Sequence, residues 1–106
     1  MTKIVYVMFK KEGMSREEFR RYWKETHAPI AKEMPGLKDY VQNHALPDPE
    51  GNEPPYDGFA ELYFESQEAM EEALGTQQGE RLLADIPNFC EMDKTLGVAV
   101  EEVKVV

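Results

Sequence analysis

The spacing of apolar and polar residues along the chain predicts two β-α-β units in succession. Short runs rich in Val, Ile, Tyr and Phe are typical of strands, and apolar residues that recur every three or four positions are typical of helices. The predicted strands cover residues 4–9, 37–45, 58–65 and 96–105. The predicted helices begin at Ser15 and Gln67, and a further short helix covers residues 79–86 before Pro87.

This order of elements is that of a ferredoxin-like α+β domain, in which two helices cover one face of an antiparallel four-stranded sheet. The chain has 106 residues, a length that suits a single domain, and we assign residues 1–106 to it.

The first predicted strand is apolar on both of its faces. One face carries Ile4, Tyr6 and Met8, and the other carries Val5, Val7 and Phe9. Because the helices cover only one face of the sheet, the second apolar face needs another partner. We therefore expect a homodimer in which two sheets pack face to face about a two-fold axis, forming a dimeric α+β barrel.

The first helix has a clear start and a clear stop signal. Ser15 and Glu18 match a capping box, in which each side chain bonds the backbone N–H of the other residue. Pro29 lacks an N–H and disfavours helical geometry at Ala28, so we expect the helix to end or kink there. A second short turn over residues 30–34 follows.

His27 continues the apolar side of this helix, because Phe19, Trp23 and His27 follow one another at intervals of four. One interpretation is a buried structural residue that packs on Trp23 and bonds a nearby backbone carbonyl. The other is an acid–base catalyst. Carbonyl groups at a helix C-terminus raise the affinity of an imidazole for a proton, which would bring its pKa near working pH.

Three polar residues share one face of the second predicted strand: Tyr40, Gln42 and His44. They would form a polar patch inside or at the rim of a cavity, and the alternative for His44 is a solvated strand end. His27, His44 and Asp57 could bind a metal as two-histidine, one-carboxylate sites do. No short-range ligand spacing supports that reading, and we expect no metal.

Glu61 lies in the middle of a predicted strand, where a carboxylate is unusual if its face is buried. It is either an ion-pair partner across the dimer interface or the group that orients and charges His27. Asp57 precedes Gly58 and is either part of an ordinary turn or a second candidate for that role. We interpret Phe89 as core or pocket lining.

Composition restricts the partners. Twelve basic and 21 acidic residues give a net charge of −9 without a basic stripe, which argues against nucleic acid and anionic membranes. The single cysteine, Cys90, fits a reducing compartment. The sequence has neither a signal-peptide pattern nor a run of about 18 apolar residues, so we expect a cytoplasmic protein.

No phosphate-binding loop, dinucleotide-binding glycine pattern, nucleophile elbow, zinc knuckle or EF-hand is present. We therefore expect no cofactor. An oxidation would need dioxygen or an added cofactor, because the chain has no internal means of handling electrons.

Three segments, SREEFRRYWKETHAPI, LKDYVQNHAL and YDGFAELYFES, resemble the EthD family in order and spacing. The family is named for a bacterial gene cluster for ethyl tert-butyl ether degradation, and the resemblance spans nearly the whole chain. It implies a dimeric α+β barrel of ferredoxin-like subunits. Its most specific parts are the YW pair and the HAP tripeptide of the first segment, followed by the YDG and AEL tripeptides of the third.

The resemblance also implies a kind of chemistry. Bacterial members accompany oxidative degradation operons, and fungal relatives are described as dehydratases or decarboxylating enzymes of aromatic polyketide pathways. Related dimeric barrels include cofactor-free monooxygenases, polyketide cyclases and lactone isomerases. Such proteins share a hydrophobic pocket worked by a few acid–base residues. The positions that match recurrent family positions are His27, Tyr40, Gln42, His44, Asp57, Glu61 and Phe89.

Three hypotheses follow. The first is a small cofactor-independent enzyme acting on an apolar cyclic or aromatic carbonyl compound. His27 would transfer the proton, Glu61 or Asp57 would set its protonation, and other side chains would hold the substrate: Trp23, Tyr40, Gln42, His44 and Phe89. The second is a non-catalytic accessory protein that binds a small apolar metabolite for a partner oxygenase. The third is a dimer whose cleft is only an incomplete core.

Overall fold

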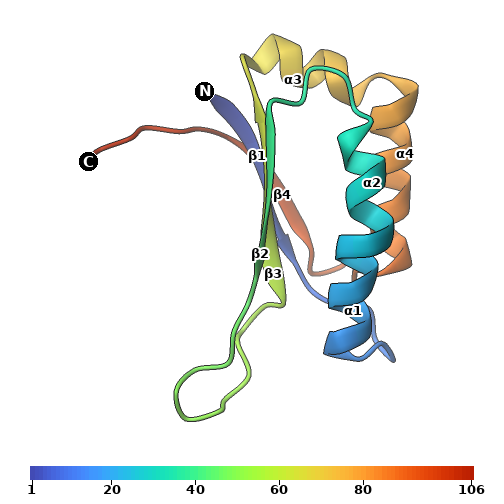
Figure 1. Cartoon of the computed structure of the whole chain (residues 1–106), viewed down its shortest axis with the longest axis vertical. Helices are drawn as coiled ribbons and strands as arrows, with labels where there is room; N and C mark the ends of the chain where they lie inside the picture. The colour runs from blue at the N-terminus through green and yellow to red at the C-terminus, as the bar shows by residue number, and fades with distance from the viewer.

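A four-stranded antiparallel sheet forms one layer of the computed structural model, which describes all 106 residues, and the helices form a second layer on one face (Figure 1). The strand order is β2-β3-β1-β4. The strands are β1 (Thr2–Met8), β2 (Asp39–His44), β3 (Gly58–Phe64) and β4 (Leu96–Glu101). This order confirms the predicted ferredoxin-like α+β fold.

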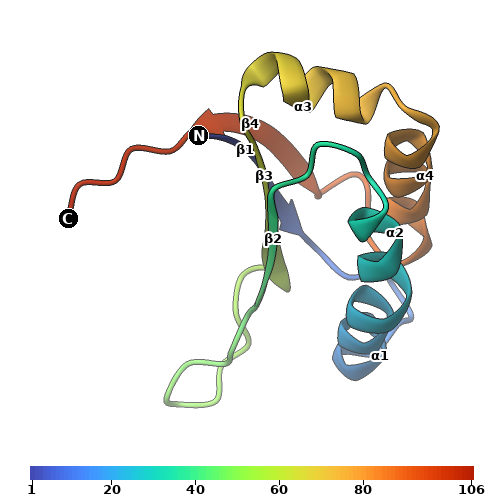
Figure 2. The ribbon, with the colours of Figure 1, turned by 45° about the horizontal axis from the view of Figure 1, so that its top comes forward.

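The last strand is shorter than expected, because it ends at Glu101 rather than near residue 105. Thr2, the first residue of β1, pairs with Glu101, and beyond this pair the N–H of Glu102 donates to the backbone oxygen of Met1, the first residue of the sequence. In Figure 2 this C-terminal segment runs away from the sheet on the side opposite the helices.

One continuous helical rod contains α1 (Arg16–Tyr22), the π-helical turn η1 (Trp23–His27) and α2 (Ala28–Lys32). The capping box of Ser15 and Glu18 is confirmed. Of the two expected outcomes at Ala28, an end or a kink of the helix, the end is wrong, because α2 continues the rod to Lys32. In the π turn the N–H of Ala28 reaches the Trp23 carbonyl, and Pro29 then stands in the first turn of α2. A proline is tolerated in a first turn, because its missing N–H has no partner to lose there.

The second helical region is split into α3 (Gln67–Leu74) and α4 (Gln77–Asp85), followed by the 3₁₀ turn η2 (Ile86–Asn88). Ser66 caps α3 as its sequence position predicts. Helix α4 begins two residues earlier than expected, at Gln77. The Thr76 hydroxyl accepts from the N–H of Gly79 and so caps the helix.

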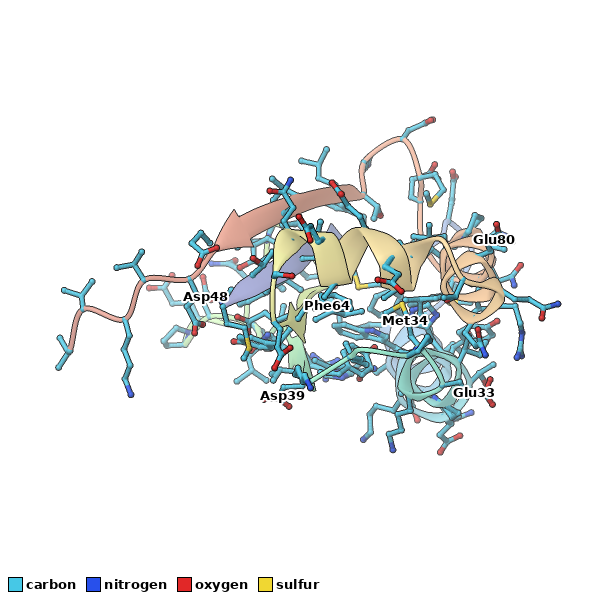
Figure 3. The ribbon with its side chains drawn as sticks, turned by 90° about the horizontal axis from the view of Figure 1, so that it is seen from above. Glu33, Met34, Asp39, Asp48, Phe64 and Glu80 are labelled. Atoms are coloured by element: carbon cyan, nitrogen blue, oxygen red, sulfur yellow. The ribbon has the colours of Figure 1, made fainter.

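The core lies between the sheet and the helical layer. Its largest fully buried side chains include Phe19, Trp23, Phe64 and Phe89. In Figure 3 the labelled side chains of Phe64 and Met34 lie between the two layers, whereas Glu33 and Glu80 lie on the outside of the helical layer. The residues that face the helices from β3 are Ala60, Leu62 and Phe64, as the alternation predicts.

The other face of the sheet carries no helix, and we call it the open sheet face (Figure 2). The strand register places Val5 between Glu61 on β3 and Val98 on β4. Leu96 is 66% exposed and Val98 is 56% exposed on the β4 side of this face. Separately, no helix of the structure is long and apolar enough to cross a lipid bilayer.

Candidate functional site

The imidazole of His27 is buried between the helical rod and α4. The residue belongs to the π turn and is 5% exposed, and its ring packs on Phe89 with 4.8 Å between the ring centroids. Its Nδ1 atom lies 2.7 Å from Oδ2 of Asp85, the last residue of α4. This contact joins two helices and fixes the plane of the imidazole.

Asp85 is held by several donors in addition to His27. Its Oδ1 atom accepts from the hydroxyl of Tyr22 at 2.6 Å and from Nδ2 of Asn88 at 2.9 Å. Burial opposes ionisation of this carboxyl, but hydrogen bonds from Tyr22, Asn88 and His27 outweigh it and hold its pKa below the ordinary value. Asp85 is therefore an anion at neutral pH.

The pKa of His27 is lowered, because burial disfavours the charged imidazole more than Asp85 favours it. The sequence argument that a helix C-terminus raises this pKa is wrong, since the helix continues to Lys32. A neutral imidazole beside a carboxylate donates its proton from Nδ1, which leaves the lone pair of Nε2 free. Nε2 has no hydrogen-bond partner within the chain.

A small cavity lies beside His27. Its apolar wall consists of Met8, Ala60, Leu62, Leu82 and Ile86, and the rings of Tyr6 and Tyr40 complete the lining. The space open to the centre of a water-sized sphere is about 10 Å³, enough for about one water molecule. No lysine or arginine lines it. The site is thus largely apolar, and it is smaller than the hydrophobic pocket that the family resemblance implies.

The three polar residues of β2 form a chain of hydrogen bonds that leads to this cavity. Nε2 of Gln42 lies 2.9 Å from the backbone oxygen of Trp23 and 2.9 Å from the hydroxyl of Tyr40. Oε1 of Gln42 lies 2.9 Å from Nε2 of His44. Burial, with Arg20 and Lys24 nearby, lowers the pKa of His44.

The indole of Trp23 lies under His44, with 4.4 Å between the ring centroids, and its N–H is buried without a hydrogen-bond partner. Contacts on the inner side of the helical rod therefore connect most of the residues that the sequence analysis selected, from β2 on one side to His27 and Phe89 near the end of α4 on the other. The residues in this region are Trp23, His27, Tyr40, Gln42, His44 and Phe89.

Glu61 and Asp57 do not belong to this region, and the expectation that either one bonds His27 is wrong. Glu61 points to the open sheet face, where it accepts from Lys3 at 2.6 Å and from Asn43 at 3.0 Å. Strand alternation places Glu61 on the side opposite Ala60 and Leu62, and the helices lie on that other side.

Asp57 is buried and has a structural set of contacts. It accepts from the backbone N–H of Lys10 at 2.7 Å and from the guanidinium of Arg16 at 3.1 Å. These bonds tie the segment that follows β1 and the start of α1 to the beginning of β3. We interpret Asp57 as an anchor for the fold.

Asp85 was missed by the sequence analysis, although one signal was present. It lies three residues after Leu82 and one before Ile86, so it interrupts the apolar side of a helix with a carboxylate. A carboxylate in that position is rarely buried unless it is paired.

Two other kinds of chemistry have little support. No group of three or more histidine, cysteine, aspartate or glutamate side chains is placed to hold a metal ion, so His27, His44 and Asp57 do not converge. Burial raises the pKa of the Cys90 thiol to about 12, which keeps it protonated at neutral pH.

Comparison with known proteins supports the architecture. The sequence profile of the EthD domain matches residues 11–93. An uncharacterized 11.0 kDa protein from the thcB-thcC intergenic region of Rhodococcus erythropolis is 27% identical over 84 residues, which are 79% of this chain and 81% of that protein.

Solved structures share the same fold. An EthD family protein from Bacillus halodurans aligns over 97% of this chain and 99% of its own, with a TM-score of 0.84 and 23% identity. A dimeric ferredoxin-like protein from Thermobifida fusca aligns over 93% and 88%, with a TM-score of 0.69 and 14% identity. SnoaB, a cofactor-independent oxygenase from Streptomyces nogalater, aligns over 99% and 95%, with a TM-score of 0.66 and 12% identity.

Proposed function

This chain belongs to the EthD family, and from that premise we propose that it is a small cofactor-independent enzyme that moves a proton on a neutral, apolar carbonyl compound. His27 is the base. The single observation that carries the proposal is the 2.7 Å contact between His27 and Asp85, which leaves one imidazole nitrogen free beside an apolar cavity.

The proposed step is removal of a proton from the carbon next to a carbonyl group. Nε2 of His27 takes the proton, and the electron pair of the broken C–H bond moves to the carbonyl oxygen to give an enolate. Asp85 stabilises the imidazolium that forms, as a buried carboxylate does for a histidine base. Because the pKa of His27 is low, the imidazole is in its basic form at neutral pH.

This step is common to several reactions. Return of the proton to another carbon is an isomerisation. Loss of hydroxide from the next carbon, together with a proton, is a dehydration. Reaction of the enolate with dioxygen begins an oxygenation. The carbonyl compound is neutral, since no lysine or arginine lines the cavity to pair with an anion.

The size of the cavity sets a condition on the substrate. Room for about one water molecule is far less than a cyclic ketone needs, so the side chains of the lining must move when a substrate enters. Leu82 and Ile86 come from α4 and η2, and their displacement would enlarge the cavity without changing the sheet.

We also propose a homodimer through the open sheet face. Leu96 and Val98 are large apolar side chains left exposed on a face that no helix covers. The dimeric state of the Thermobifida fusca neighbour supports this assignment. The proposed partners are therefore a second copy of the chain and a small apolar molecule.

The direct test is hydrogen–deuterium exchange on a probe ketone. The protein is incubated with cyclohexanone in D₂O, and loss of the signals of the protons next to the carbonyl is followed by NMR. We expect His27→Ala to lower the protein-dependent rate by about 10²–10⁴-fold, the usual range for a positioned acid–base group.

Gln78→Ala, an exposed change on α4, is the control and keeps the wild-type rate. Equal exchange by wild type and His27→Ala would refute the proposal. Thermal stabilisation by the ketone without any exchange would instead favour the accessory binding protein as the function.

A further inference from the structure

The hydrogen bonds of Gln42 have a direction that can be deduced from the structure. The backbone oxygen of Trp23 can only accept a hydrogen bond. The side-chain atom of Gln42 that lies 2.9 Å away must therefore be the amide nitrogen and not the amide oxygen. The Trp23 carbonyl also accepts from the N–H of Ala28 within the π turn, so both of its bonds come from donors.

The amide nitrogen of Gln42 has two hydrogens, and the structure gives each one an acceptor. The first points to Trp23, and the second points to the hydroxyl oxygen of Tyr40 at 2.9 Å. Tyr40 is thus an acceptor in this bond. Its own O–H has no acceptor within the chain, and its ring lines the cavity that His27 also lines.

The other end of the amide agrees with this direction. The amide oxygen of Gln42 can only accept, so His44 must carry a proton on the Nε2 atom that lies 2.9 Å away. His44 is neutral at neutral pH, because burial and its basic neighbours lower its pKa. The two histidines therefore have opposite tautomers, with the proton on Nδ1 in His27 and on Nε2 in His44.

We propose that Gln42 is a positioning residue that makes Tyr40 a hydrogen-bond donor to the ligand in the cavity beside His27. The site would then bind a ligand with an acceptor oxygen at Tyr40 and a removable proton at Nε2 of His27. This assignment rests on the proposed function and refines it. Gln42 and His44 do not line the cavity, and the amide of Gln42 is bonded within the protein, so Gln42 acts on the ligand only through Tyr40.

A donor with a fixed direction has a kinetic advantage. The O–H of Tyr40 is oriented before the ligand arrives, so it stabilises the developing enolate oxygen without reorganisation. If the amide were reversed, the hydroxyl of Tyr40 would donate to Gln42 and would no longer be available to the ligand.

Two substitutions at Gln42 separate positioning from a simple role in stability. In Gln42→Glu, a carboxylate oxygen replaces the donor, so Tyr40 donates to residue 42 and not to the ligand. If this carboxyl is protonated, its single hydrogen is donated to the Trp23 carbonyl. The hydroxyl of Tyr40 then still donates to the other oxygen of residue 42. In Gln42→Met, the side chain keeps a similar length and has no amide, so the O–H of Tyr40 stays available.

We expect cyclohexanone exchange to fall about 10²–10³-fold in Gln42→Glu, as for the loss of an oxyanion donor, and to fall equally in Tyr40→Phe. Gln42→Met should lower the rate by about tenfold or less, because the O–H of Tyr40 stays available to the ligand but is no longer oriented by the amide. Gln78→Glu, the same change on the exposed surface of α4, is the matched control and should keep the full rate. An equal loss in Gln42→Met and Gln42→Glu would refute the positioning role.

The tautomers provide a readout that does not depend on activity. Long-range ¹⁵N–¹H correlation NMR at about pH 8, where both histidines are neutral, should show the proton of His44 on Nε2 and that of His27 on Nδ1. A His44 proton on Nδ1 would mean that the Gln42 amide is reversed, and it would overturn the inference. The expected tautomers without any exchange by the wild-type protein would refute the proposed function and support the orientation of Tyr40.

Discussion

His27 and Asp85 are 58 positions apart in the chain, and their side chains meet through a 2.7 Å contact between Nδ1 and Oδ2. The histidine comes from the first helical rod and the aspartate from the end of α4. The pKa of each group lies below its ordinary value, which describes a neutral imidazole that donates to a carboxylate. The pair is thus charged only at the aspartate in the resting protein.

Asp85→Asn should lower the exchange rate of the probe ketone by about 10²-fold or more, because the imidazolium loses its stabilising anion. It should also destabilise the fold by about 1–3 kcal/mol, since the amide cannot satisfy the donors of Tyr22, Asn88 and His27 together. Exchange kinetics and urea unfolding measure the two effects.

Asp93→Asn is the control for that substitution, because Asp93 is exposed. This substitution should leave the exchange rate unchanged, and it should change the free energy of unfolding by less than about 0.5 kcal/mol. A normal exchange rate in Asp85→Asn would remove the aspartate from the mechanism.

Stability should depend on pH through His27. Its pKa is lower in the folded protein than the unfolded value of about 6.5. Below that value the unfolded chain binds the proton and the folded chain does not, so the free energy of unfolding falls as the pH falls from about 6.5 to the folded pKa. Above about pH 6.5 neither state binds the proton, so this loss of stability is absent.

His44 should lower the free energy of unfolding in the same pH range, since its pKa is also lowered in the folded protein. Asp85 acts in a separate window at lower pH, between its unfolded and folded pKa values. Urea unfolding measured from about pH 8 down to about pH 4 tests this. The slope between about pH 6.5 and pH 5 should become smaller in His27→Gln. An unchanged slope would contradict a lowered pKa for His27.

Gly97→Ala should disturb the cavity through Tyr6. A Cβ atom at position 97 would overlap Cε1 of Tyr6, so the ring must move, and Tyr6 is part of the cavity lining. We expect a loss of about 1–3 kcal/mol in stability, as for overpacking, together with slower exchange of the probe ketone.

Gly75→Ala is the matched change for comparison, because its Cβ would meet ordinary contacts of 3.5 Å and 3.6 Å. It should leave the exchange rate unchanged. If Gly97→Ala has the stability and the rate of the wild type, Tyr6 does not limit the cavity.

Val98→Lys should break the proposed homodimer. The substitution places a charge on the open sheet face, where burial against a second copy would desolvate it. Light scattering should then give the 12.2 kDa mass of one chain instead of about twice that mass.

Val103→Lys is the control, since Val103 lies in the exposed segment that follows β4. This variant should keep the mass of the wild-type protein. A wild-type protein that is monomeric at micromolar concentration would contradict the proposed interface.

The sequence by itself determined the features that depend on neighbours along the chain. The capping box of Ser15 and Glu18, the cap at Ser66 and the alternation of β3 are local, so residue type and spacing predict them. The interval of four between Trp23 and His27 likewise placed both residues on one side of the first helix.

Only the tertiary structure decided which carboxylate meets His27. The alternation along β3 places Glu61 and Leu62 on opposite faces of the sheet, but it does not tell which face the helices cover. Because the helices cover the face of Leu62, Glu61 is excluded from the site. The contact between His27 and Asp85 depends on how α4 packs against the helical rod. The rod continues past Pro29 because of a π turn, and the Trp23 carbonyl of this turn also accepts a hydrogen bond from Gln42 of β2. Contacts between residues distant in sequence depend on packing geometry, and no local pattern records them.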